Sequence, residues 1–533
     1  MTVAREFPLK ERTVVSILRK AVAENEDKVF VRPPASDPLT YGEFNRITNC
    51  CANNLSRVGL GKDGKIAIMA KNSLAFLHSW FAAAKLGAVY VPINTEYKGS
   101  ILRHQLSKAD VTHVVIDRDL AARLIEVMAE LPKLEVVIIH DNTDDAIDLS
   151  KLEERFKVIA IDELYEGDEA EPEVDISYAD PLAISFTSGT TGPSKGVLAT
   201  NCHVVSFSLD WMKACQFTSE DRLFTSLPMF HAIASWLGVL PTIIAGTEFA
   251  FTERFSATQF WDDVRRNDST VVHGVFSIIP MLLKQPPRDD DKDVPARLFY
   301  IGQRNQEFED RFNCRIVEVY GATETGIVTY TPFDETSTKG SCGKANVDTY
   351  HVAIVDDDDN ILPPGEVGEI VVRPSQPYSM IQEYYNMPNE TLAAFRNLWF
   401  HTGDNGRMDE DGAFFFVDRK KDAMRRRGEN ISSYELEVVL NSDPRVAECA
   451  AIAVPSDLGE DEVKMVIVRA DGATLSAEDV WALCEDQMPK FWVPRFIEFR
   501  DSLPKTPNQK IQKYLLRGNV DQGEMFDRET ADV

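Results

Sequence analysis

Helical and strand patterns alternate through the first part of the chain. Apolar residues recur at helical spacing in several segments, and short runs rich in Val, Ile and Ala separate these segments. The expected helices are 41–58, 73–86, 101–108 and 120–131, and the expected strands are 65–70, 88–93, 112–116 and 134–140. Strands separated by helices of this length favour a parallel sheet covered on both faces. The pattern therefore predicts an α/β fold.

The pattern changes near residue 340. Residues 350–355 and 369–373 alternate as antiparallel strands would, and the acidic turn 356–360 follows the first of them. Four aspartates in that turn raise the alternative of a calcium site, but the spacing of an EF-hand loop is absent. We therefore expect a solvated hairpin turn at this place.

The last part of the chain has the pattern of a compact α+β unit. The expected elements are helices 434–440 and 477–487 and strands 447–454, 464–469 and 496–500. The tail that follows Gly518 is acidic, so we expect it to be mobile.

A loop of small residues stands out between these regions, in the stretch PLAISFTSGTTGPSKGVLATNCHVVSFSLD (181–210). An apolar run at 182–186 predicts a buried strand before the loop, and a helix is expected after it. Glycine lets successive backbone N–H groups converge on an anion, hydroxyl side chains add donors and Lys195 adds a positive charge. The loop residues are Thr187, Ser188, Gly189, Thr190, Thr191, Gly192, Lys195 and Gly196.

This composition predicts a phosphate-binding loop. The spacing differs from that of a Walker loop, because the lysine follows G-x-x-G-x-x and precedes glycine rather than Ser or Thr. A flexible Gly/Ser/Thr surface loop is the alternative. A second glycine pattern, Gly59, Gly61 and Gly64, satisfies G-x-G-x-x-G but follows a helix and precedes a strand, which is the reverse of the order in dinucleotide-binding folds.

Composition narrows the classes of protein. The 533 residues are 44% hydrophobic and 27% charged, as in ordinary globular proteins. A formal net charge of −28 disfavours nucleic acid and anionic membranes as partners. The most apolar stretch, 232–246, is too short to span a bilayer, and the N-terminus lacks an apolar signal core, so we expect no integral membrane segment and a cytoplasmic location. The eight cysteines lack C-x-x-C spacing, which predicts buried thiols rather than a metal cage or disulfides.

The loop T-S-G-T-T-G-P-S-K-G resembles the signature of the adenylate-forming superfamily, which contains acyl-CoA synthetases, adenylation domains and luciferases. Four further segments in the same order strengthen the resemblance. They are Y-G-A-T-E at 320–324, W-F-H-T-G-D at 399–404, the hinge segment FVDRKKDAMRRRGENISSYELE at 416–437, and L-P-K-T-P-N-Q-K at 503–510. The hinge segment is most similar to the crotonobetaine/carnitine-CoA ligase-like branch.

The resemblance implies a nucleotide site. Its ATP- and AMP-binding residues would be Thr187, Ser188, Gly189, Thr190, Thr191, Gly192, Lys195, Glu318, Tyr320, Gly321, Thr323, Asp404 and Arg419. In that family Tyr320 would stack on adenine, Glu324 would hold Mg²⁺ and Asp404 would bind the ribose hydroxyls. Lys510, Glu324 and Thr187 would be catalytic. Gln509 replaces the family's usual glycine before this lysine.

The resemblance also implies an acyl pocket, a path for CoA and a hinge. Phe230, His231, Trp236, Phe276 and Gly302 would form the pocket, although Phe230, His231 and Phe276 could equally be plain core residues. Only Gly302 matches the family's small-residue adenine loop. Arg425, Arg426, Arg427 and Gly428 would line the CoA path, with a solvated charge run as the alternative for the arginines. Lys421 would be the hinge.

The resemblance implies an architecture as well. A large N-terminal AMP-binding domain (1–418) would combine doubly wound α/β subdomains with a small β-barrel-like subdomain. A hinge (419–422), a small mobile α+β C-terminal domain (423–518) and the acidic tail (519–533) would follow.

The implied activity is that of an ATP-dependent acyl-CoA synthetase of fatty acid or carnitine metabolism, with ATP, Mg²⁺, CoA and a small carboxylic acid as partners. Aromatic pocket walls predict an apolar, aromatic or cationic acyl group. A homodimer is one option for its assembly. An adenylation enzyme that loads a carrier protein and a non-catalytic nucleotide sensor on the same fold are the rival functions.

Overall fold

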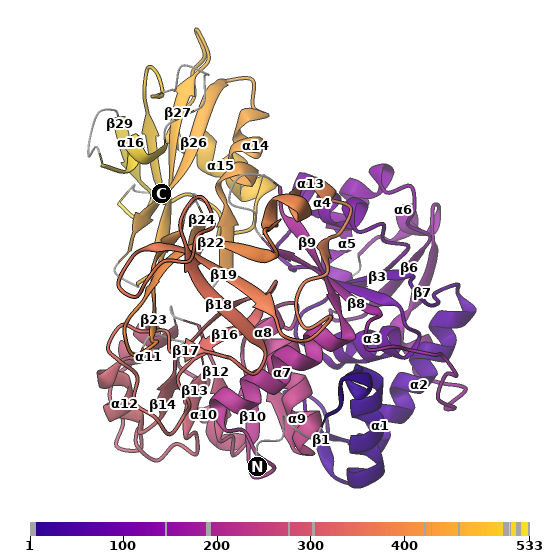
Figure 1. Ribbon diagram of the computed structural model, residues 1–533. Helices are drawn as coiled ribbons and strands as arrows, with labels where there is room; N and C mark the ends of the chain where they lie inside the picture. Colours follow the sequence, from indigo (N-terminus) through magenta and orange to yellow (C-terminus); the bar gives the residue numbers. More distant parts are fainter. Residues whose placement is uncertain are drawn as a thin grey trace.

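We analysed a computed structural model of the chain (Figure 1). The structure describes residues 7–143, 147–187, 193–275, 278–300, 304–419, 423–427, 429–456, 459–504, 511, 513–518 and 524–530. Among these residues no helix is both long and apolar enough to cross a membrane.

The first layer of the large domain is a mostly parallel sheet of eight strands in the order β20-β9-β8-β4-β3-β5-β6-β7. Its strands are β3 (Lys65–Met69), β4 (Val89–Pro92), β5 (His113–Asp117), β6 (Val136–His140), β7 (Lys157–Ala160), β8 (Pro181–Thr187), β9 (Lys195–Thr200) and β20 (Glu383–Tyr384). The connecting helices are α2 (Tyr41–Arg57), α3 (Leu74–Lys85), α4 (Gly99–Lys108) and α5 (Ala121–Val127). Every helix and strand expected between residues 41 and 140 is therefore present.

Local sequence explains where these helices begin. Thr40 and Glu43 form a capping box at the start of α2, in which each side chain accepts the other residue's backbone N–H. Ser73 caps α3 by accepting the N–H of Phe76. Nearly every residue of α3 is buried, because the helix packs against α2 and against the sheet.

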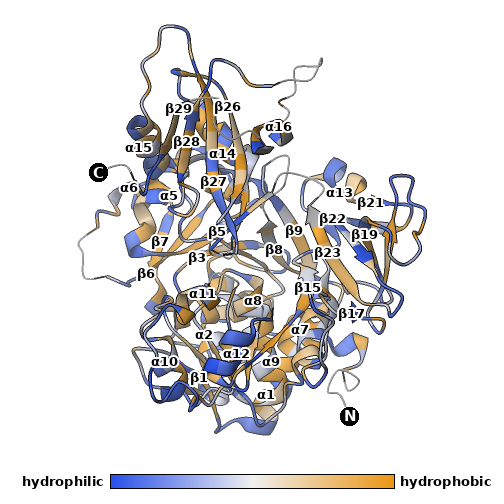
Figure 2. Cartoon of the chain, turned by 90° about the vertical axis from the view of Figure 1, so that its left-hand side faces the viewer, coloured by the Kyte–Doolittle hydropathy of each residue, from blue (hydrophilic) through white to orange (hydrophobic). Residues whose placement is uncertain are grey.

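The second layer is a sheet of seven strands in the order β14-β13-β12-β10-β11-β1-β2. Its strands are β1 (Val29–Arg32), β2 (Leu39–Thr40), β10 (Arg222–Thr225), β11 (Glu248–Phe251), β12 (Val271–His273), β13 (Leu298–Tyr300) and β14 (Arg315–Val317). Its neighbouring helices are α1 (Val14–Asn25), α7 (Asn201–Cys215), α9 (Leu240–Ala245), α10 (Phe260–Arg266), α11 (Ile278–Leu283) and α12 (Gln306–Phe312). Apolar residues concentrate inside these layers (Figure 2).

A β-rich subdomain follows in the sequence. One antiparallel sheet consists of β15 (Val319–Ala322), β16 (Gly326–Tyr330) and β17 (Lys344–Ala345). The other consists of β18 (Tyr350–Val355), β19 (Gly368–Pro374), β21 (Phe395–Arg396), β22 (Trp399–Met408) and β23 (Phe414–Arg419), with α13 (Pro388–Ala394) beside it. The acidic turn after β18 is held by Asp356, whose carboxylate accepts N–H groups of Asp358 and Asn360. This turn is a hairpin turn, as expected.

The C-terminal domain sits against the large domain, at the top of Figure 1. It contains the hairpin β24 (Ala423–Arg426) and β25 (Glu429–Ser432), a sheet of β26 (Val446–Pro455), β27 (Asp461–Arg469), β28 (Phe496–Phe499) and β29 (Glu524–Asp527), and helices α14 (Ser433–Asn441), α15 (Ala477–Gln487) and α16 (Lys513–Gly518). The fold is thus α/β with an α+β C-terminal domain, as the sequence predicts.

Two sequence expectations differ from the structure. The phosphate loop leads into strand β9 before helix α7, because the apolar run after Gly196 pairs with β8 as an antiparallel strand. Part of the tail expected to be mobile, 524–527, forms β29 and pairs with β28. Arg495 supports β29 by binding Asp527 at 3.0 Å, so the acidic composition of the tail supplies an ion-pair partner.

Candidate active site

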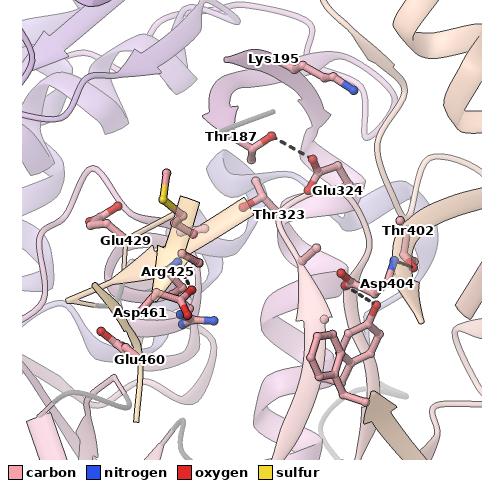
Figure 3. Close-up of a pocket in the computed structure, with 18 of the residues that line it drawn as sticks. Thr187, Lys195, Thr323, Glu324, Thr402, Asp404, Arg425, Glu429, Glu460 and Asp461 are labelled. Carbon is pink, nitrogen blue, oxygen red and sulfur yellow. Dashed lines mark hydrogen bonds between the residues drawn. The ribbon is translucent and has the colours of Figure 1, made fainter. Parts of the chain in front are cut away.

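A cavity of about 1560 Å³ lies between the large domain and the C-terminal domain. It draws its lining from strand ends and loops of both domains (Figure 3). The residues that the sequence singles out and that line it are Thr187, Lys195, Phe230, His231, Glu318, Tyr320, Gly321, Thr323, Glu324, Asp404 and Arg425. Motifs more than 200 residues apart in the sequence therefore face one space.

Glu324 is the centre of a polar cluster in this cavity. Thr187 Oγ1 donates a hydrogen bond of 2.9 Å to Glu324 Oε1, drawn as a dashed line in Figure 3. The Tyr384 hydroxyl donates to the same oxygen at 3.2 Å. Lys195 Nζ lies 4.6 Å from the centre of the Tyr384 ring. A carboxylate, a hydroxyl and an ammonium group thus converge within one cluster.

The β8–β9 hairpin explains how Thr187 and Lys195 come together. The two residues are cross-strand partners at the loop end of the hairpin, where β8 leads into the phosphate loop and β9 leaves it. A Cβ at Gly196 would lie 2.7 Å from Ile184 Cγ2, so this position needs glycine for the two strands to pack. The lysine and the threonine therefore both reach the cavity from the paired ends of two adjacent strands.

A second polar pair in the cavity is formed by Tyr320 and Asp404. The Tyr320 hydroxyl donates to Asp404 Oδ2 at 2.9 Å. Burial, together with the nearby Asp404 carboxylate, raises the pKa of Tyr320 well above its usual value, so the phenol is a neutral donor. A Cβ at Gly321 would meet the Gly326 carbonyl oxygen at 2.0 Å, which explains the glycine beside this tyrosine.

The backbone beside Asp404 is held by Glu369, a residue that the sequence reasoning missed. Glu369, which also lines the cavity, accepts the N–H of Gly403 at 2.9 Å and contacts His401 Nδ1 at 3.1 Å. Glu318 is also buried, and its Oε1 accepts the backbone N–H of Arg304 at 3.0 Å. Glu369 gave no sequence signal, because it lies on β19, outside the recognised motifs.

The apolar end of the cavity contains Phe230 and His231 but not Trp236. Trp236 is buried behind this wall, where its Nε1 donates to the Tyr90 hydroxyl. The sequence shows that residue 236 is aromatic, but it does not show which face of its helical segment lines the cavity. The lining residues that the sequence reasoning missed here are Phe207, Ile233, Leu237 and Tyr300.

The C-terminal domain contributes the hairpin β24–β25 to the opposite wall. Arg425 lines the cavity, and its backbone N–H donates to Asp461 Oδ2 at 2.8 Å (Figure 3). Arg426 instead faces its own domain, where it pairs with Glu462 at 2.7 Å and donates to backbone carbonyl oxygens of residues 491 and 493. Arg427 is exposed. Of the arginine triplet, Arg425 is the one that lines the cavity.

Direct contacts join the two domains beside the phosphate loop. Glu435, on α14, accepts the backbone N–H of Ser194 at 2.9 Å. Burial raises the pKa of Glu435 to about 7, although its hydrogen bonds with Ser194 act in the other direction. Lys98 Nζ donates to the Glu485 carbonyl oxygen at 2.6 Å on the same side. The phosphate loop and the C-terminal domain are therefore connected through Ser194.

The Glu324 carboxylate is suited to bind a magnesium ion together with the phosphates of a nucleotide. Among the described residues, no group of three or more His, Cys, Asp or Glu side chains could hold a metal alone. Mg²⁺ is usually bound by one or two carboxylates together with substrate phosphates and water. The hydrogen bonds from Thr187 and Tyr384, which lie in the described part of the chain, both end on Oε1, so Oε2 is the oxygen that we expect to meet the metal.

Several predicted site residues lie outside the described part of the chain. They are Ser188, Gly189, Thr190, Thr191, Gly192, Phe276, Gly302, Lys421, Gly428 and Lys510. The backbone of Arg419 pairs with that of Asp404 in the β22–β23 ladder. The roles expected for these residues stay predictions.

Two family matches cover most of the chain. The family described as "AMP-binding enzyme" matches residues 18–385, and the family described as "AMP-binding enzyme C-terminal domain" matches residues 435–510.

Individual relatives agree with these matches. A crotonobetaine/carnitine–CoA ligase of Salmonella choleraesuis is 32% identical over 494 residues, covering 90% of this chain and 93% of the relative. The ATP-bound crystal structure of MatB from Rhodopseudomonas palustris has a TM-score of 0.67 at 28% identity, covering 94% of this chain and 98% of the other. An o-succinylbenzoate CoA synthetase of Bacillus subtilis, bound to a product analogue, has a TM-score of 0.80 at 22% identity, covering 94% and 98%. This last likeness shows the fold alone.

Proposed function

Because the chain belongs to the AMP-binding enzyme family and is an AMP-forming acid–CoA ligase, we propose that it activates its acid in two steps at the cavity between its domains. A carboxylate oxygen attacks the α-phosphorus of ATP, the bond to the β-phosphate breaks and pyrophosphate leaves. The CoA thiolate then attacks the acyl carbonyl carbon, and AMP leaves as the C–S bond forms. The thiol proton is released to solvent or to a base.

The observation that carries this proposal is the cluster at Glu324. Thr187 and Lys195 come from the β8–β9 hairpin, and Glu324 comes from the segment that follows β15, yet all three line one cavity. Lys195 would neutralise phosphate charge, Thr187 would orient the carboxylate and Glu324 would hold Mg²⁺. When bound, Mg²⁺ would withdraw negative charge from the phosphates. Asp404 would bind the ribose at the other end.

The wall from the C-terminal domain supports the second step. In the present arrangement the β24–β25 hairpin brings Arg425 and Glu429 to the cavity, and Glu429 directly follows Gly428 in the sequence. A thiol that entered between the domains would pass this hairpin. We therefore assign this arrangement of the domains to thioester formation, and we propose that the C-terminal domain rotates about Lys421 so that Lys510 serves the first step.

The acyl group that fits the cavity is apolar or aromatic, or carries a cation held against aromatic faces. Phe207, Phe230 and Tyr300 supply aromatic surface at this end, and Leu237 adds an aliphatic side chain. A wall of this size favours groups larger than that of acetate. The Salmonella relatives are named for carnitine and crotonobetaine, and we include such acids among the candidate substrates. The cytoplasm is the location that we propose.

The test is a panel of carboxylic acids offered to the purified protein with MgATP and CoA. We expect pyrophosphate and AMP in equal amounts, together with a thioester, only when an accepted acid is present. Formation of ADP would contradict the proposal. A carrier-protein loading enzyme would release pyrophosphate without transferring the acyl group to free CoA, and a nucleotide sensor would release none. Glu324→Gln keeps the volume of the side chain but not its charge and serves as the control variant. Its loss of pyrophosphate release, relative to the wild type, should be greatest at limiting magnesium.

A further inference from the structure

Tyr384 connects two parts of the site that are far apart in the sequence. It lies on the short edge strand β20, which pairs with β9, the strand that begins at Lys195. Just before β20, the backbone N–H of Ile381 donates to the Glu324 carbonyl oxygen at 2.8 Å. The segment 381–385 is therefore fixed by backbone hydrogen bonds to both the lysine strand and the glutamate.

Inside the cavity, the side chain of Tyr384 also contacts both Lys195 and Glu324. Its ring lies 4.6 Å from Lys195 Nζ, and its hydroxyl donates to Glu324 Oε1 at 3.2 Å. The residue is only 6% exposed, so water competes weakly for either contact.

Each contact has a definite physical consequence. The face of an aromatic ring attracts an ammonium group, so the ring limits where Lys195 can lie. The Tyr384 hydroxyl and Thr187 both donate to Oε1 of Glu324, a residue that lines the cavity, so the two bonds restrict the rotation of the carboxylate. One side chain thus orients a cation and an anion whose relative placement decides how MgATP would be held.

We propose that Tyr384 is a positioning residue that orients Lys195 and the Glu324 carboxylate before MgATP binds. This inference rests on the proposed function, because it takes Lys195 and Glu324 as the groups that meet the nucleotide and its metal. It assigns separate tasks to the two parts of the side chain. The ring acts on phosphate binding through Lys195, and the hydroxyl acts on metal binding through Glu324.

The neighbouring tyrosine provides a matched control. Tyr385 directly follows β20 and, unlike Tyr384, is not part of the cavity lining. Its hydroxyl lies 3.4 Å from Asp110 Oδ2, and its ring lies 5.6 Å from Lys65 Nζ. Tyr385 thus makes the same two kinds of contact as Tyr384, but with residues outside the site.

The experiment compares Tyr384→Phe, Tyr384→Leu and Tyr385→Phe with the wild type in the full-length protein. Isothermal titration measures ATP binding without acid or CoA, at zero and at saturating Mg²⁺, so the readout does not depend on turnover. Thermal unfolding of each variant is recorded in parallel, and KM and kcat for MgATP are then measured with an accepted acid.

Tyr384→Phe should leave metal-free ATP binding unchanged and weaken the magnesium-dependent gain in affinity about 3- to 10-fold, which corresponds to the loss of one typical hydrogen bond of about 1 kcal/mol. Tyr384→Leu should also weaken metal-free ATP binding, by about 3- to 30-fold, because the cation–π contact is lost. Both variants should raise KM for MgATP more than they lower kcat. Tyr385→Phe should match the wild type in each measurement.

The inference is overturned if Tyr384→Leu binds ATP as the wild type does, with and without Mg²⁺. It is also overturned if the change in affinity equals that of Tyr385→Phe, or if Tyr384→Phe and Tyr384→Leu have the same effect. A wild-type protein that neither binds MgATP nor releases pyrophosphate would instead refute the proposed function. The two failures are therefore distinguishable in one set of measurements.

Discussion

The large domain and the C-terminal domain line the same cavity, but their polar groups are held in different ways. On the large-domain side, functional side chains bond to one another, as Thr187 and Tyr384 do with Glu324, and Tyr320 with Asp404. On the C-terminal side, the hairpin residues bond within their own domain, and Glu435 and Glu485 make contacts across the domain boundary. The part of the site proposed to bind the nucleotide is thus held together within one domain. The part proposed to bind CoA depends on where the C-terminal domain docks.

This difference teaches that the two half-reactions should respond separately to mutation. Changes inside the large domain should act on adenylate formation in any arrangement of the domains. Changes at the C-terminal wall or at the domain boundary should act on thioester formation, unless the residue serves the other arrangement. Each experiment below measures both half-reactions, with pyrophosphate release for the first and the reaction of a supplied acyl-adenylate with CoA for the second.

The largest effect is expected for the pair Lys510→Ala and Gly428→Trp. Lys510 should reach the carboxylate and the α-phosphate in the adenylating arrangement, and losing such a donor costs about 10²- to 10³-fold in rate. Gly428 should matter only after rotation, when a bulky side chain would block the thiol path. Lys510→Ala should therefore abolish most pyrophosphate release and spare thioester formation, and Gly428→Trp should do the reverse. Equal damage to both steps by both variants would break the comparison.

A smaller effect is expected at Glu435, which joins the C-terminal domain to the phosphate loop. Glu435→Ala removes the acceptor for the Ser194 N–H, so thioester formation should fall about tenfold while pyrophosphate release is preserved. Glu435→Gln keeps an acceptor and should lose less. A loss confined to pyrophosphate release would show that this contact belongs to the first step.

The same residue gives a pH dependence whose sign follows from its environment. In the docked domain burial raises the pKa of Glu435 from 4.5 to about 7, and Tyr97 is an ionisable group that lies close to it. Between pH 4.5 and about 7, Glu435 is protonated in the docked form but ionised in the undocked form. Docking therefore takes up a proton and becomes weaker as the pH rises through this range. The ratio of thioester rates, wild type over Glu435→Gln, should therefore fall through this window and level off above it. Ionisation of the CoA thiol is common to both proteins and cancels in the ratio.

The sequence predicted those parts of the fold and site that are encoded by neighbouring residues. The α/β pattern and the strand before the phosphate loop follow from local spacing, and the structure contains them. The motifs at 320–324 and 399–404 were identified by their resemblance to a known family, and residues of both line the cavity. Tyr384 was missed because its contacts join residues 195, 324 and 384, and no local pattern shows which of two adjacent tyrosines faces the cavity. The strand β29 was missed because its acidic residues suggest a solvated tail until the Arg495 partner is seen.

The smallest effect, and the finest test of the comparison, is expected within the arginine triplet. Arg425 lines the cavity, whereas Arg427 is exposed and is not among the residues that line it. Both lie on or beside the β24–β25 hairpin. A single arginine contact with a phosphate at a partly solvated site contributes about 1 kcal/mol, which is about fivefold in affinity. Arg425→Ala should thus raise the KM for CoA about fivefold, Arg427→Ala should change it less than twofold, and neither should alter pyrophosphate release. The Arg425 effect should shrink as the salt concentration rises, because the contact is electrostatic. If Arg427→Ala has the larger effect, CoA approaches from the outer face of the hairpin, and the cavity wall described for the C-terminal domain is not the surface that CoA meets.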